Sequence, residues 1–281
     1  MATTTVCILH PGEMGAEVGA AARAARARVL WVSAGRGGAT RDRARAAGFE
    51  DAGTLKAALD QSQIVLSVCP PHAAVELAES VAAGGFGGTY VDANAVAPET
   101  SRRIGGAVGT AGATFVDGGI IGPPPTKPGT TRLYLSGPAS AEVAALFDGS
   151  PLGTVVLDAP VGAASAVKAC YAGWTKGAAT LLLSVRALAR HEGVEAALAE
   201  EWKISQPSLF AQLDRAVLQS RKGWRWIAEM EEIGATFRAG GLPDGFALAA
   251  AEVCRTLEPF KDASRLTIED VVGALLAPSK K

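Results

Sequence analysis

The chain has 281 residues, of which 48% are hydrophobic, enough apolar material for a large core in one or two domains. A net charge of −1 without a charge block argues against a nucleic-acid partner. No apolar run is long enough to span a membrane, and no signal peptide is recognisable. Four scattered cysteines without a CxxC pair favour reduced thiols in a cytoplasm and argue against a metal site.

The first predicted elements are a strand, a glycine turn and a helix. The apolar run 6–9 predicts a buried parallel strand, and an alanine-rich helix is predicted over 16–27. Such a turn favours a dinucleotide phosphate, because glycine lets the main chain approach and the helix N-terminus offers N–H groups. We expect cofactor contacts from His10, Pro11, Gly12, Glu13 and Met14.

The glycine motif is incomplete, because His10 stands where GxGxxG has its first glycine. An ordinary turn that binds nothing is therefore the alternative. His10 itself could contact the cofactor or simply end the strand, and we favour the strand end.

The second predicted strand, 28–33, bears on the choice of cofactor. It ends at Ser33, and Arg36 and Arg41 follow, without the carboxylate that would bind the ribose 2′-OH of NAD. A hydroxyl and guanidinium groups suit a 2′-phosphate, so we predict NADP in preference to NAD. The alternative is that both arginines are solvated surface charges.

The next segments alternate between helix and strand. Helices are predicted over 40–48, with Thr40 as N-cap, and over 52–59, 72–82, 98–105 and 139–147; strands are predicted over 64–69, 89–94, 114–117, 131–136 and 154–157. Ligands of a doubly wound sheet lie off the carboxyl ends of its strands. We therefore expect further cofactor contacts from Cys69, Pro70, Pro71 and Asn94.

The stretch 118–125, rich in glycine and proline, is predicted to be an irregular loop that either holds a substrate or serves as a structural crossover. Beyond Pro160 the pattern becomes helical, with helices predicted over 162–190, 194–202, 208–220, 224–239, 246–257 and 267–276. The predicted fold is thus an α/β protein with a Rossmann doubly wound sheet over 1–160 and an all-helical domain over 161–281.

With these elements placed, the sequence resembles the β-hydroxyacid dehydrogenase family, which is related to 6-phosphogluconate dehydrogenase, to 3-hydroxyisobutyrate dehydrogenases and, more distantly, to imine reductases. The resemblance rests on the motifs GEMG at 12–15, CPP at 69–71, DAN at 92–94 with Pro98, DGGIIG at 117–122, which matches the family's substrate loop, and GAASAVK at 162–168. It implies that Lys168 is the catalytic acid/base and that the helical domain forms a homodimer. It also implies substrate contacts from Gly119, Ile120, Ile121 and Gly122.

The sequence departs from the family at several places. Ile121 replaces a serine that helps to bind a substrate carboxylate, and Ala172 replaces an asparagine. The Glu231-Glu232 region replaces a Lys-Asp pair. These changes favour a less acidic or bulkier substrate. The tryptophans of the helical domain could line its pocket or belong to the core, namely Trp174, Trp224 and Trp226.

Lys168 also fits the chemistry. Reduction of C=O needs a proton at oxygen, which a positioned ammonium supplies while it stabilises the oxyanion. Tyr171 is a possible second proton donor. Lys176 is the competing candidate for the catalytic lysine. The alternative without function is that Lys168 is a surface lysine on an amphipathic helix. We expect an NADP-dependent oxidoreductase for a small or medium hydroxy or carbonyl compound. The alternatives are an imine reductase and a non-catalytic NADP-binding protein.

Overall fold

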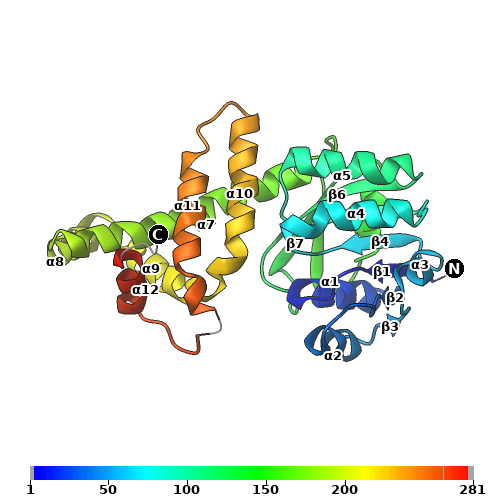
Figure 1. The fold of residues 1–281 in the computed structure, drawn as a ribbon, viewed down its shortest axis with the longest axis horizontal. Coiled ribbons are helices and arrows are strands. Elements are labelled where there is room, and N and C mark those ends of the chain that lie inside the picture. Colours follow the sequence, from blue (N-terminus) through cyan, green and yellow to red (C-terminus); the bar gives the residue numbers. More distant parts are fainter. Residues whose placement is uncertain (1–2, 262, 278–281) are drawn as a thin grey trace. The chain divides into compact units, whose positions relative to one another are not determined.

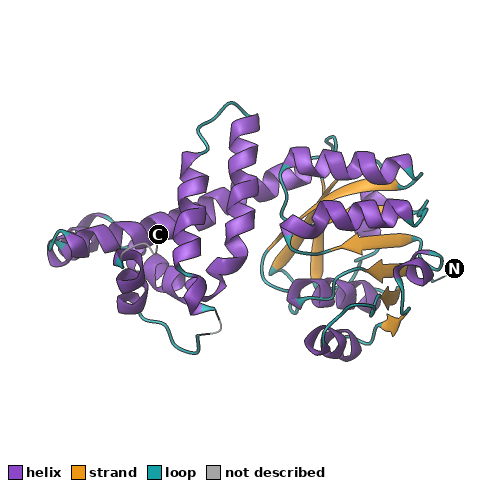
Figure 2. Cartoon of the chain, in the orientation of Figure 1, coloured by secondary structure: helices purple, strands orange, loops and turns teal. Residues whose placement is uncertain are grey.

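The computed structural model describes residues 3–261 and 263–277. The chain divides into two compact units, Met1–Ala169 and Cys170–Lys281. This division falls inside the long helix α7 (Ala163–His191), whereas the predicted boundary lies before it, at residue 160. Every described strand belongs to the first unit, and the second is built from helices (Figures 1 and 2). The predicted α/β fold with a helical C-terminal region is confirmed.

The first unit contains one eight-stranded sheet in the order β3-β2-β1-β4-β5-β6-β7-β8. All neighbouring strands are parallel except β6 and β7, which are antiparallel. The order reverses beside β1, which marks the switch point where doubly wound sheets bind ligands. The strands are β1 (Thr5–Ile8), β2 (Arg28–Trp31), β3 (Glu50–Asp51), β4 (Ile64–Ser67), β5 (Thr89–Asp92), β6 (Thr114–Ile121), β7 (Thr131–Ser136) and β8 (Leu152–Val156).

Helices cover both faces of this sheet. Successive residues of a strand point to opposite faces, so Val6 and Ile8 enter one core cluster and Cys7 enters the other. Burial on both faces explains why β1 and β4 read as unbroken apolar runs. The first cluster includes side chains of α1 (Glu13–Ala24), α2 (Gly38–Ala46) and α6 (Ser140–Ala145), and the second those of α3 (Leu55–Leu59), α4 (Ala74–Ala83) and α5 (Pro98–Thr110).

Several local predictions are corrected. The region 118–121 is not a loop but the end of β6, because the backbone of Gly118 and Gly119 pairs with β7. Helix α1 begins at Glu13, so the predicted turn is already helical there. The N-cap of α2 is Gly37 and not Thr40. The two-residue strand β3 and the 3₁₀ turn Pro71–Ala73 before α4 were not predicted.

The second unit packs around a core shared by α7 and the helices that follow it, with Leu183, Trp202 and Val271 among its buried side chains. Its helices agree closely with the predicted ranges. They are α8 (Glu195–Ser205), α9 (Ser208–Gln219), α10 (Gly223–Ala239), α11 (Gly245–Thr256) and α12 (Ile268–Leu276).

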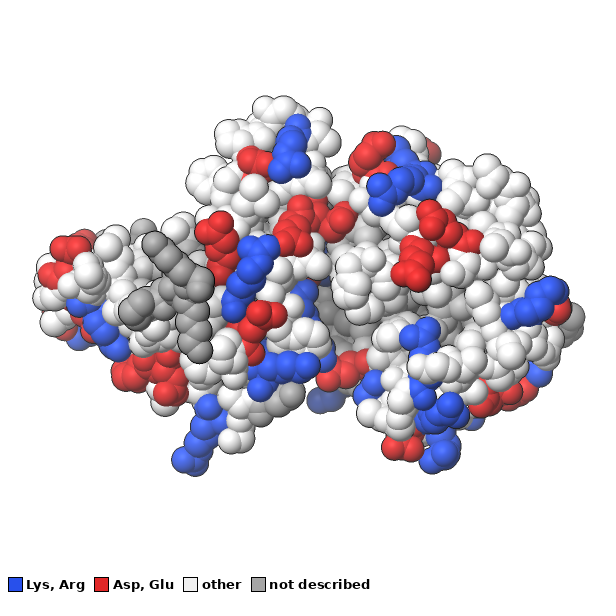
Figure 3. Space-filling model, in the orientation of Figure 1, with Lys and Arg blue, Asp and Glu red and all other residues white. Residues whose placement is uncertain are grey.

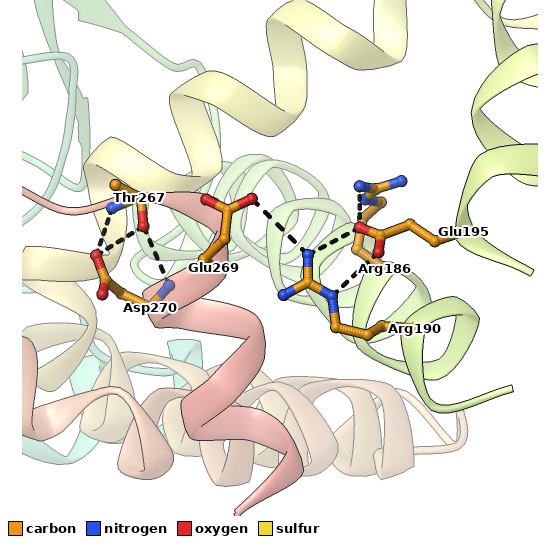
Figure 4. A network of polar contacts seen from close by, with 6 residues as sticks. All are labelled: Arg186, Arg190, Glu195, Thr267, Glu269 and Asp270. Carbon is orange, nitrogen blue, oxygen red and sulfur yellow. Dashed lines mark hydrogen bonds and ion pairs between the residues drawn. The ribbon is translucent and has the colours of Figure 1, made fainter. Parts of the chain in front are cut away.

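Polar contacts also hold this unit together (Figure 4). Glu195, in the first turn of α8, pairs with Arg186 and Arg190 of α7. Arg190 also lies 3.8 Å from Glu269 of α12, whose N-terminus carries a capping box between Thr267 and Asp270.

Acidic and basic side chains are interspersed over the face drawn in Figure 3. In the part of the chain that the structure describes, no helix has the length and apolarity to cross a bilayer, and no metal-binding group of acidic, histidine and cysteine side chains occurs. All four cysteines are free. The cytoplasmic location stays a prediction.

Candidate functional site

In the first βα turn, the start of α1 packs closely against the chain at the end of β1, as it does in phosphate-binding turns. Gly12 caps α1 without a side chain, and its carbonyl accepts from Ala16 N at 2.9 Å. A Cβ atom on Gly15 would lie 2.2 Å from the carbonyl oxygen of His10, so only glycine allows this close packing of helix and strand. The N–H groups of the first turn of α1 therefore open at the carboxyl end of β1, where an anion is stabilised.

His10 contacts the second βα turn. Its Nδ1 lies 3.0 Å from Nη1 of Arg36, and Nη2 of Arg36 donates to the carbonyl of Leu9 at 3.3 Å. Burial, together with the positive charges of Arg36 and Arg43, lowers the pKa of His10. A neutral imidazole can accept through Nδ1, so His10 holds Arg36 in addition to following the strand end.

Two further arginines join Arg36. Arg41 donates to the carbonyls of Ser33 and Arg36 at 3.1 and 3.0 Å. Arg43 donates to the carbonyl of Pro11 at 3.2 Å and to Thr40 Oγ1 at 3.2 Å. Among the described residues, no carboxylate forms an ion pair with any of the three arginines of this group (Arg36, Arg41 and Arg43).

The arginine group concentrates positive charge beside the glycine turn. Backbone carbonyls, rather than carboxylates, fix the positions of its side chains. Such a set of guanidinium groups matches the planar, bidentate recognition of phosphate. Arg43 was not predicted from the sequence. Its position two residues after Arg41 is the signal that could have indicated it. Both arginines lie on α2, which begins earlier than predicted.

The carboxyl ends of β4 and β5 are tied together by Asn94. Its Oδ1 accepts from Cys69 N at 2.5 Å, and its Nδ2 donates to Ser67 Oγ at 2.9 Å. Its backbone N donates to Asp92 Oδ1 at 3.0 Å. Asn94 is buried and thus fixes the turn that carries Cys69, Pro70 and Pro71. Burial and the nearby charge of Asp92 raise the pKa of the Cys69 thiol to about 12, so this thiol stays protonated.

Asp117 on β6 connects the sheet to the start of α7. Its carboxylate is fully buried. It accepts hydrogen bonds from the backbone N–H groups of Gly162 and Ser165 and from the hydroxyls of Ser101, Ser136 and Ser165. These contacts satisfy N–H groups that a helix leaves unpaired at its N-terminus, and the negative charge suits the helix dipole.

Lys168 lies one turn beyond this cap. A Cβ atom on Gly119 would lie 3.1 Å from Cβ of Lys168 and 2.6 Å from the carbonyl oxygen of Ala164. Gly119 thus admits α7 to the face of β6 that also carries Asp117. Ile121 follows on the same face and is buried, whereas Ile120 packs in the first core cluster on the opposite face. The structure therefore brings Lys168 next to the predicted substrate-binding strand end.

The three remaining candidates of α7 lie in the second unit. Lys176 forms an ion pair with Glu229, and its Nζ lies 5.2 Å from the ring centroid of Trp226. Its side chain and that of Glu229 are 16% and 10% exposed, so the pair is largely buried. Tyr171 and Trp174 are exposed, which excludes Trp174 from the core of this unit.

Comparisons with known proteins assign the fold. Residues 189–257 match a family model described as a domain of unknown function, DUF1932. The 3-hydroxyisobutyrate dehydrogenase of Mycobacterium tuberculosis with L-serine is 16% identical over 98% of this chain and 100% of that chain, with a TM-score of 0.72. This chain has the 3-hydroxyacid dehydrogenase fold. The predicted resemblance is thus confirmed at the level of the fold.

Two further solved structures extend the comparison. A reductive aminase from Aspergillus terreus, in complex with NADPH and ethyl levulinate, is 22% identical over 98% of this chain and 100% of that chain, with a TM-score of 0.56. A conserved hypothetical protein from Sinorhizobium meliloti 1021 is 23% identical over 98% and 96% of the two chains, with a TM-score of 0.72. No curated protein matches the chain.

Proposed function

We propose that this chain is an NADP-dependent oxidoreductase that moves a hydride between the nicotinamide and a small or medium hydroxy or carbonyl compound. The arginine group carries the cofactor part of the proposal, because three guanidinium groups that form no ion pair with a described carboxylate suit a 2′-phosphate beside the glycine turn. The fold supports the class of reaction, since its structural neighbours include dehydrogenases and reductases.

In this proposal each part of the first unit has its own task. The first turn of α1 binds the pyrophosphate through backbone N–H groups, and the turn fixed by Asn94 borders the cofactor at the ends of β4 and β5. The bound nicotinamide supplies or accepts the hydride. The ammonium of Lys168 donates a proton to the substrate oxygen and stabilises the negative charge that develops there. We assign Tyr171, three residues further along α7, as a second donor.

An imine reductase is the second candidate function. The reductive aminase solved with NADPH shares this fold, and Ile121 stands where the resembled family has a carboxylate-binding serine. A buried apolar residue at this place suits an uncharged substrate. A non-catalytic NADP-binding protein is the third candidate.

Thermal unfolding with each cofactor tests the proposal first. A ligand that binds only the folded state raises its stability, so NADPH is expected to raise the Tm more than NADH at equal concentration. Oxidation of NADPH is then followed with panels of ketones, hydroxy acids and cyclic imines. Protection by neither cofactor contradicts the proposal, turnover of imines alone selects the second candidate, and binding without turnover selects the third.

We also propose that the chain forms a homodimer along α7. Leu181 and Leu188 are 64% and 59% exposed, and Trp174 is 76% exposed. Their spacing of seven residues places them on one stripe of the helix. Large exposed apolar side chains in a row mark a contact surface, and a two-fold axis would bury the stripes of both copies together. The stripe consists of the exposed side chains Trp174, Leu181 and Leu188.

A further inference from the structure

The start of α7 is held by a residue far away in the sequence. Helices are commonly capped by the residue just before their first turn. Here the cap comes from Asp117 on β6, whose Oδ2 accepts from Gly162 N and Ser165 N, each at 3.0 Å. Ser136 on β7 adds to this cap, because its hydroxyl accepts from Ala164 N at 3.1 Å and donates to Asp117 Oδ2 at 2.9 Å.

The cap also sets the rotation of the helix. Ser165 donates its hydroxyl to Asp117 Oδ1 at 2.5 Å, and Lys168 lies three residues later, on the same helix face. On β6, Asp117 and Gly119 are two residues apart and share a face. Ser165 therefore contacts Asp117, and Lys168 lies against Gly119. These two adjacent contacts fix the position of this turn of α7 along β6 and its rotation about the helix axis.

We propose that Asp117 is a positioning residue that places the Lys168 ammonium for proton transfer. This inference rests on the proposed function of Lys168. Asp117 acts through the N-terminus of α7, and its buried carboxylate is already engaged by three hydroxyls and two N–H groups. A small change in the cap would shift Lys168, and a misplacement of about 1 Å can reduce a rate by about a hundredfold.

Two serines that bind the same carboxylate provide a matched test. Ser165 and Ser101 are both buried and both donate to Asp117 Oδ1, at 2.5 and 2.8 Å. Ser165 belongs to α7, whereas Ser101 belongs to α5. Ser165→Ala and Ser101→Ala each delete one hydroxyl donor and should lower the Tm by similar amounts. Ser165→Ala removes a contact made by α7 itself, whereas Ser101→Ala reaches α7 only through the carboxylate.

The experiment measures kcat, the Kd for NADPH and the pH dependence of acylation at Lys168, read by mass spectrometry of its peptide. We expect Ser165→Ala to lower kcat about tenfold and to shift the acylation profile, with the Kd unchanged within about twofold. Ser101→Ala, which acts on α7 only through the carboxylate, should lower kcat and shift the profile clearly less than Ser165→Ala. Asp117→Asn, which replaces one acceptor oxygen by an NH2 donor, should exceed the effect of Ser165→Ala.

Equal effects of the two serine variants on kcat and on the acylation profile would overturn the proposal, and so would no effect of either. A failure of the proposed function gives a different result. In that case the wild-type protein oxidises no NADPH with any substrate panel. The acylation profile then still decides whether Ser165 and Asp117 control the surroundings of Lys168.

Discussion

Gly119 of β6 lies directly against Lys168 of α7. A Cβ atom at position 119 would come within 3.1 Å of Cβ of Lys168 and 2.6 Å of the carbonyl oxygen of Ala164. The second atom belongs to the backbone and cannot turn away as a side chain does. The residue at position 119 therefore determines how closely the helix approaches the sheet.

Gly119→Ala should push α7 away from β6. We expect a loss of about 1–3 kcal/mol in the free energy of unfolding, as overpacking typically causes, together with a lower kcat. Urea denaturation and steady-state kinetics measure both. Gly106→Ala is the control, because a Cβ atom there meets nothing within 4 Å and alanine favours the helix α5. Equal stability losses in both variants would contradict the packing argument.

Arg43→Ala should weaken the binding of NADPH and leave that of NADH nearly unchanged. A hydrogen bond to a charged group contributes about 1.5–3 kcal/mol, which corresponds to at least about a tenfold rise in Kd. Titration calorimetry with each cofactor measures the two values. Arg45→Ala serves as the control, since Arg45 lies on the same helix but pairs with Asp42 at the surface. Similar losses for NADPH and NADH would show that Arg43 does not recognise the 2′-phosphate.

His10 should make stability depend on pH. Its pKa is lowered in the folded protein, so between the folded and unfolded pKa values the unfolded chain binds more protons. Stability should therefore fall as the pH drops through the unfolded value of about 6.5. Melting curves between about pH 5 and 8 should flatten in His10→Gln, whose amide oxygen can still accept from Arg36. Melting temperatures that depend on pH as steeply in His10→Gln as in the wild-type protein would contradict this role of His10.

Substitutions of the two lysines of α7 should have different effects, one on activity and the other on stability. Lys168→Met should lower kcat by about a hundredfold or more, the usual range for loss of an acid catalyst. Lys176→Met removes the largely buried ion pair with Glu229, and loss of one member of a buried pair typically costs about 3–5 kcal/mol. Thermal melts and kinetics on the folded fraction distinguish the two. If Lys176→Met abolishes turnover in folded protein, the roles of the lysines are reversed.

Leu181→Glu should prevent dimer formation. A charge in the middle of an apolar stripe would be buried in the proposed dimer, so the variant should sediment as a monomer. Ile204→Glu is the control, because Ile204 is 82% exposed on α8 and lies outside the stripe. Sedimentation velocity measures the state of each protein. A monomeric wild-type protein would reject the proposed dimer.

The local signals predicted most elements well. The apolar runs of β1 and β4 and the 3.6-residue periodicity of the C-terminal helices are properties of short segments, so the sequence alone reveals them. The same holds for the first βα turn, where strand, glycine and helix follow one another directly.

The missed features depend on contacts between distant segments. Gly118 and Gly119 suggested a loop, but pairing with β7 satisfies their backbone and turns them into strand. Arg43 reaches Pro11 only once β1 and β2 lie side by side. The cap of α7 comes from Asp117, more than forty residues before Ser165, and no motif near the helix start announces it.

The cap from β6 has a consequence for protein engineering. A chimaera that joins the helical C-terminal unit to a different α/β domain would separate α7 from its carboxylate if the junction fell between residues 121 and 162. Grafts should therefore exchange the segment from β6 onward as one piece, or supply an aspartate at the equivalent strand position of the recipient.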